Sequence, residues 1–237
     1  MPSWAKASSD SIESASAEKR PIVLYFADEA DSDFEMYGED FAELSKMDAM
    51  FIKIAYTADR EVSPWAEESV VPTSKLLSDN PSREYNIRVG DATVLVCDWF
   101  GNEYFRTDNR VKADKLKAMV ERVADQVEDA NKKLQKNLDK ANGYVEKEDQ
   151  KNAVKYLVKN FDEGVVGLEA QEASIRLYHE IMDNVRSQKD ELVEKGDVDG
   201  LKELAKVVKK TELEKEIDEA MDAAKEVAAN SGPTTQK

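Results

Sequence analysis

The sequence predicts an α/β sandwich, with a central mixed sheet and flanking helices, followed by an all-α domain of helical hairpins. Over residues 1–124, short apolar and β-branched runs alternate with helical patterns. From residue 112 onward, apolar residues recur at intervals of three and four with few breaks. At 237 residues, the chain exceeds the usual size of one domain. We therefore expect domains at 1–124 and 125–229 and a polar tail at 230–237.

The first half carries the strand signals. Apolar runs predict buried strands, and two of them flank a turn at 99–102 and form a hairpin; the four strands are 22–27, 50–56, 93–98 and 103–106. A helix over 3–18 would begin with Ser3 as its N-cap, and Trp4 would anchor it to the core. Residues 28–48 hold nine acids and one lysine around apolar positions spaced by three and four. This pattern predicts an amphipathic helix with an acidic outer face.

The second half is helical throughout. A single helix of about 30 residues should run from the end of the first domain to Val145, because no Pro or Gly interrupts the pattern before Gly143. Further helices are expected at 150–161, 168–194, 199–210 and 212–229. The segment VEKED at 145–149 returns as VEKGD at 193–197, which indicates a helical hairpin used twice. YVEKEDQKNAVKYL resembles the middle of a tetratricopeptide repeat, so this domain is expected to be tetratricopeptide-like.

Composition excludes several functional classes. The net charge is −16, with 11 Lys/Arg against 22 Asp/Glu in residues 1–110. Nucleic acids and anionic membrane surfaces require clustered positive charge, so neither is expected as a partner. No apolar run reaches the length of a membrane span, and no leader pattern begins the sequence, so a cytoplasmic location is expected.

The order of elements, together with KRPIVLYF and YNIRVGDATVLVCDWFGNEYFR, resembles the thioredoxin superfamily over about residues 3–124. That resemblance places Asp31 and Phe34 at the two redox cysteine positions and Ala92 at the position of the facing cis-proline. In an alternative register, Pro72 would take the proline position. Tyr25 falls where the family has a buried assisting acid. The resemblance therefore implies the fold without its redox pair.

Neither thiol chemistry nor a metal centre is expected. Cys97 is the only cysteine and lies within a predicted buried strand, so it should act as a small apolar residue. His179 is the only histidine, which excludes a catalytic triad and a multi-histidine metal site. The acids near Asp31 resemble a calcium loop but lack its glycine and place its last glutamate one position late. We expect no catalytic residue, no metal and no cofactor.

Four aromatic residues are candidates for partner contact: Phe34, Trp65, Trp99 and Phe100. Trp99 and Phe100 occupy a hairpin turn that does not require bulky side chains, so they either fold back onto the helical domain or contact a partner. The resulting hypothesis is a redox-inactive, thioredoxin-like protein that binds other proteins as a chaperone-like or scaffold module.

Two alternatives remain open. One is a structural subunit of a larger assembly, and the oligomeric state is not predicted. The other is an enzyme that uses Asp31, Asp33 or Glu35 with Tyr25 or Tyr37 for acid–base chemistry at the former redox site.

Overall fold

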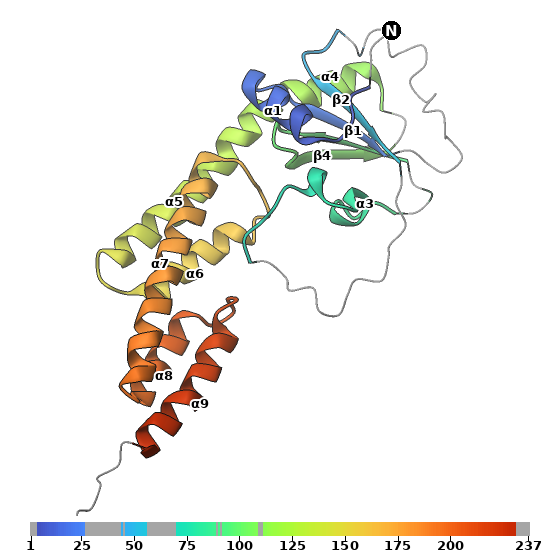
Figure 1. Cartoon of the computed structure of the whole chain (residues 1–237). Coiled ribbons are helices and arrows are strands. Elements are labelled where there is room, and N and C mark those ends of the chain that lie inside the picture. The colour runs from blue at the N-terminus through green and yellow to red at the C-terminus, as the bar shows by residue number, and fades with distance from the viewer. Residues whose placement is uncertain are drawn as a thin grey trace, which may run out of the picture. The chain divides into compact units, whose positions relative to one another are not determined.

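The computed structural model describes residues 4–26, 44, 46–55, 70–88, 90, 92–108 and 111–230, except for the side chains of 108 and 230. The chain divides into two compact units. The first comprises 1–67, 73–131 and 164–168, and the second comprises 68–72, 132–163 and 169–237. A mixed sheet with flanking helices is followed by a helical C-terminal region, which confirms this coarse prediction (Figure 1).

The sheet of the first unit has the strand order β2-β1-β3-β4. Its strands are β1 (Ile22–Phe26), β2 (Met50–Ile54), β3 (Thr93–Cys97) and β4 (Glu103–Asp108). β1 and β2 run parallel, whereas β3 is antiparallel to both β1 and β4. All four strands lie within two residues of the predicted bounds, because each run combines apolar and β-branched residues between turn residues.

The chain before the first helix extends this sheet. Ala5 donates its backbone N–H to the carbonyl of Phe51 at 2.8 Å and forms a parallel bridge beside β2. The first helix, α1 (Ser9–Glu18), therefore begins later than expected, and the N-cap is Ser8. The prediction that the helix starts at Ser3 is wrong, since pairing with β2 holds that segment extended.

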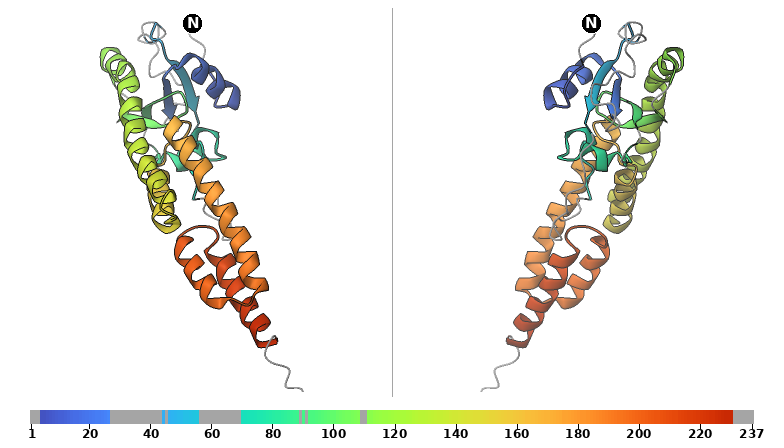
Figure 2. Two further views of the ribbon diagram at one scale, coloured as in Figure 1. Left: turned by 90° about the vertical axis from the view of Figure 1, so that its left-hand side faces the viewer. Right: turned by 90° about the vertical axis from the view of Figure 1, so that its right-hand side faces the viewer.

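Apolar residues fill the space on both faces of the sheet. The ring centre of Trp4 lies 6.1 Å from those of Tyr25 and Phe51, so Trp4 packs against the sheet, although it lies before the helix that it was predicted to anchor. Alternate residues of β1 instead join a core with α1. α1 and α4 (Ala113–Glu121) lie on opposite faces of the sheet (Figure 2), and two short helices, η2 (Lys75–Leu77) and α3 (Pro81–Glu84), precede β3.

The helix predicted as continuous through residue 145 is divided. α4 ends at Glu121, and α5 (Val123–Val145) follows after Arg122. The Arg122 N–H donates to the Met119 carbonyl at 3.2 Å, a tighter turn than the α-helical one. Its guanidinium lies 5.5 Å from the centre of the Phe105 ring, a cation–π contact that favours this position.

The second unit consists of helices whose bounds agree closely with the prediction. They are α6 (Gln150–Phe161), α7 (Glu169–Glu194), α8 (Val198–Val207) and α9 (Glu214–Asn230), with the later part of α5. The repeated segment forms the same turn twice. Glu148 and Gly196 both have positive φ, and the aspartate that follows each caps the next helix. The expected reuse of one helical hairpin is confirmed at these two turns.

Buried polar contacts join the helices of this unit. Asn160 is fully buried and donates to the Leu134 carbonyl and to the Ser174 hydroxyl at 3.0 and 2.8 Å. The Asn137 side chain donates to the side-chain oxygen of Asn160. Because each polar atom of this amide has a partner, the contacts fix how α5, α6 and α7 pack without leaving a desolvated group.

Candidate functional site

The structure describes only part of the site that the sequence resemblance suggests. Asp31, Phe34 and Trp65 lie outside the described residues, as do Asp33, Glu35 and Tyr37. Ala92 is buried immediately before β3. No peptide bond in the described part of the chain is cis, so Pro72 is trans. Tyr25 is fully buried in β1.

Cys97 is enclosed by the sheet, which confirms its predicted burial. It is fully buried in β3, opposite Ile22 of β1. Burial, reinforced by the negative charges of Asp98 and Glu103, raises the pKa of the Cys97 thiol well above its usual range. A nucleophilic cysteine needs the opposite environment, exposed and electropositive, so this thiol is protonated and shielded.

The β3–β4 turn is organised by a buried carboxylate. Asp98 accepts hydrogen bonds from the backbone N–H groups of Phe100 and Asn102, both at 2.9 Å, and from the Asn102 side chain at 2.8 Å. Burial raises the pKa of Asp98 while these hydrogen bonds oppose the shift. Both carboxylate oxygens are occupied by donors within the turn, so Asp98 stabilises the turn rather than offering a free base.

The same turn holds a distant segment of the first unit. The Asn102 side chain donates to the Val166 carbonyl at 2.8 Å and accepts from the Val166 N–H at 2.7 Å. The Phe100 ring lies directly against Gly167, where an added Cβ would come within 3.0 Å of three ring carbons. Trp99 is partly buried against the core. Sequence reasoning missed the role of Asn102, because no local pattern signals a partner 64 residues away.

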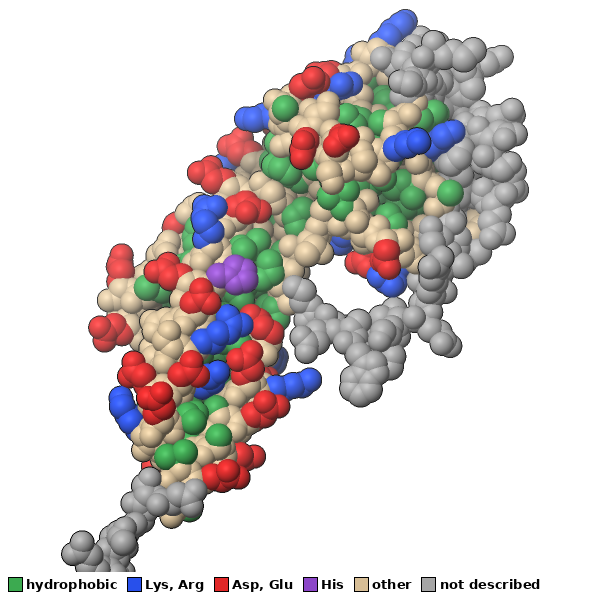
Figure 3. Space-filling view, in the orientation of Figure 1, with side chains coloured by type: hydrophobic (Ala, Val, Ile, Leu, Met, Phe, Trp, Pro, Cys, Tyr) green, Lys and Arg blue, Asp and Glu red, His purple; other side chains and the backbone are tan. Residues whose placement is uncertain are grey.

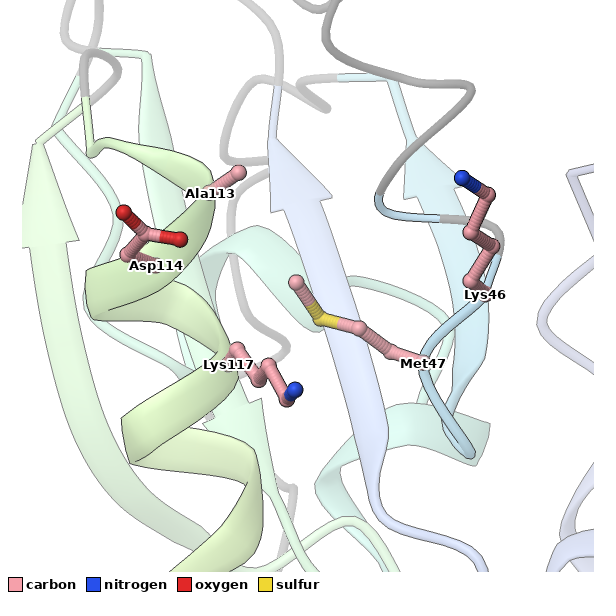
Figure 4. Close-up of a pocket in the computed structure, with 5 residues that line it drawn as sticks. All are labelled: Lys46, Met47, Ala113, Asp114 and Lys117. Atoms are coloured by element: carbon pink, nitrogen blue, oxygen red, sulfur yellow. The ribbon is translucent and has the colours of Figure 1, made fainter.

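A small hollow lies on the first unit between α4 and the segment that leads into β2. It has a volume of about 240 Å³ and is lined by Lys46, Met47, Ala113, Asp114 and Lys117. Figure 4 shows Met47 extending across β1 toward α4, whereas the Lys46 ammonium points away. These charged groups come from two elements and do not converge on one point, so the hollow has no evident catalytic arrangement.

A longer groove lies between α6 and the end of α8 in the second unit. We call it the lysine groove; it has a volume of about 280 Å³ and is lined by Lys151, Val154, Lys155, Val158, Lys159, Asp162, Lys206, Val207, Lys209 and Lys210. All six lysines are exposed, while the valines are buried or half-buried. The groove thus combines an apolar floor with a positive rim, on a chain of net charge −16.

A second groove of the same unit has a different character. It has a volume of about 500 Å³ and is lined by Val145, Glu148, Gln150, Leu177, Glu180, Ile181, Asn184 and Gln188. Its rim carries two acids and three amides around apolar residues. Val145 is 37% exposed, one of two large hydrophobic residues in the described chain that are this accessible.

Outside the lysine groove, acidic side chains outnumber basic ones on the helices of the second unit. Acidic and basic side chains are interspersed over the helices of the second unit, and the exposed His179 is the purple patch in Figure 3. Lysines such as Lys195, Lys202 and Lys225 pair with acids three or four residues earlier in the chain. These pairs form a solvated surface and contribute little to stability.

No family model, curated protein or solved structure matches this chain. None of the described helices is both long and apolar enough to cross a bilayer. The functional argument therefore depends on the geometry of the sites above.

Proposed function

We propose that this chain is a redox-inactive, thioredoxin-like protein that binds other proteins. The observation that carries the proposal is that the thiol of Cys97 is buried, whereas the accessible surface has grooves that could hold a peptide. The only thiol is sealed inside β3 with a raised pKa, while the open grooves of the second unit have apolar floors and charged rims. Such grooves are suited to holding a peptide segment and contain no nucleophile–base pair.

The arrangement of the sheet supports the thioredoxin-like part of the proposal. Two parallel strands are followed by an antiparallel hairpin, and a helix precedes the sheet's first strand. The bridge at Ala5 adds a further parallel partner to β2. This order agrees with the layout inferred from the sequence, in which a thioredoxin-like domain carries a helical C-terminal domain. Fold likeness alone does not assign an activity, so binding rests on the grooves.

Two assays test the proposal. In an insulin-reduction assay, the protein should not accelerate precipitation above the reductant alone, and Cys97→Ala should behave identically. Affinity capture from source extract should recover a reproducible partner set with wild type, and mass spectrometry should quantify it. Thiol-dependent turnover would refute the redox-inactive role, and the absence of any specific partner would refute the binding role.

The same capture experiment examines the aromatic turn. Trp99→Ala/Phe100→Ala should lose partners if these rings contact them, whereas equal recovery would remove the turn from the binding surface. Size-exclusion chromatography with light scattering provides the complementary measurement. A stable large assembly of this chain alone would favour the structural-subunit alternative.

A further inference from the structure

The lysine groove has the geometry of a two-sided channel. Lys151, Lys155 and Lys159 recur every four residues along α6, so they lie along one side of that helix. The other three lysines come from the end of α8 and the residues just after it. Nine helical residues, 151–159, span about 12 Å, so the positive rim extends over roughly two helical turns.

Helix stability does not explain most of these lysines. Lys159 and Lys206 lie in the last turns of their helices, where positive charge interacts favourably with the helix dipole. Lys206 also pairs with Glu203 at 2.5 Å, and Lys159 lies 4.4 Å from the centre of the Tyr156 ring. The remaining four lysines of the groove do not combine a place in the last turn of a helix with a contact to an acid or an aromatic ring.

Lys151 lies in the first turn of α6, where the helix dipole disfavours a cation, although the neighbouring Asp149 interacts with it. Lys155, Lys209 and Lys210 are exposed, and neither they nor Lys151 form a salt bridge with an acid in the described part of the chain. The groove lining contains six lysines and one acid. Their mutual repulsion costs stability and would be relieved by an anionic occupant.

The apolar floor of the groove indicates which kind of anionic ligand would fit. Val158 and Val207 are half-buried and face the groove between the lysines. Covering these two valines is favourable when the ligand brings aliphatic side chains that exclude water from them. Neither a free phosphate nor a phosphate backbone supplies such groups. No aromatic residue lines the groove, so it offers no stacking surface for a nucleobase. The match is a ligand with carboxylates on its edges and aliphatic groups between them.

We infer that the lysine groove binds an acidic amphipathic peptide segment of a partner protein, with its aliphatic side chains on the valine floor and its carboxylates on the lysine rims. This inference rests on the proposed binding function and names the partner chemistry for one groove. The rim accommodates about two turns of helix, in which aliphatic residues four apart face the floor. Because the lysine rims are exposed, binding should be tighter at low salt.

The probe is a fluorescein-labelled peptide of about twelve residues, with Leu at two positions four apart and Glu at the flanking positions. Binding to the full chain is measured by fluorescence anisotropy at about 50 and about 300 mM NaCl. One control peptide replaces each Leu with Ser, and another replaces each Glu with Gln. The parent peptide should bind, its affinity should fall with salt, and both controls should bind at least about tenfold more weakly.

The test variant is Lys155→Glu/Lys209→Glu, which reverses two unpaired charges in the groove. The matched control is Lys136→Glu/Lys215→Glu, two exposed lysines of the same unit that do not line the groove. Both variants change the net charge of the chain equally. Affinity should fall at least about tenfold in the test variant and less than about twofold in the control.

Several results would overturn the inference. Equal losses in the two variants would mean that binding follows net charge alone. Equal binding of the Leu and Ser peptides would remove the role of the floor. If a second copy of the chain occupies the groove, light scattering should show a dimer that dissociates in Lys155→Glu/Lys209→Glu. Preferential binding to phosphatidylserine vesicles would indicate that the groove binds a lipid surface. If the peptide fails to bind while wild type still captures partners from extract, the groove inference fails and the proposed binding function stands.

Discussion

Replacing Gly167 with alanine should destabilise the first unit far more than the same change at Gly164. Both glycines have positive φ, 76° and 65°, so each alanine costs about 1–2 kcal/mol in backbone strain. No atom outside the neighbouring residues lies within 4 Å of a Cβ built at Gly164, whereas at Gly167 that Cβ meets the Phe100 ring. Overpacking adds about 1–3 kcal/mol. The expected losses are therefore about 1–2 kcal/mol for Gly164→Ala and about 2–5 kcal/mol for Gly167→Ala.

Urea unfolding followed by tryptophan fluorescence is the appropriate assay. All three tryptophans of the chain precede residue 100, so the signal reports on the first unit. Both variants should then be made again with Phe100→Ala. Without the ring, the difference between the two glycine variants should shrink by about 2 kcal/mol, which measures the coupling directly.

Equal destabilisation by Gly164→Ala and Gly167→Ala, unchanged by Phe100→Ala, would refute this packing. The Phe100 ring would then be free of Gly167 in solution, and its predicted role as a partner contact would gain weight. The experiment thus discriminates between the two uses that the sequence leaves open for this residue.

Three further predictions concern buried groups. Asn102→Ala removes three side-chain hydrogen bonds to Asp98 and Val166 and should lower the free energy of unfolding by about 3–5 kcal/mol. As a control, replacing the exposed Asn142 with alanine should change it by less than about 0.5 kcal/mol. A loss below about 1 kcal/mol for Asn102→Ala would contradict the hydrogen-bond network. The fully buried amide of Gln171 has no hydrogen-bond partner among the described residues, so Gln171→Met should raise the thermal unfolding temperature, and a lower temperature would indicate an additional partner. Burial raises the pKa of Cys97, so the native thiol stays protonated at a pH where the unfolded thiol ionises. The free energy of unfolding should therefore fall as pH rises above about 8.5, and it should fall less in Cys97→Ala. An equal pH dependence of the two proteins would show that Cys97 does not contribute.

The sequence alone determined the four strands and the helices of the second unit. Strands and helices followed from periodicities of two and of three to four, which reflect local geometry and burial on one face. The repeated VEKED and VEKGD segments specified equivalent turns, because an aspartate N-cap after a positive-φ residue is a local arrangement. The single cysteine within an apolar strand likewise predicted its own burial.

Only the tertiary structure decided which distant residues meet. The start of α1 was misjudged because Ala5 pairs with β2, a contact that helical periodicity does not encode. Asn102 and Val166, and Phe100 and Gly167, are brought together by the path of the chain rather than by any local pattern. The lysines of α6 and α8 look like ordinary solvated charges in the sequence. They become one positive rim only because the two helices pack with their valines between them.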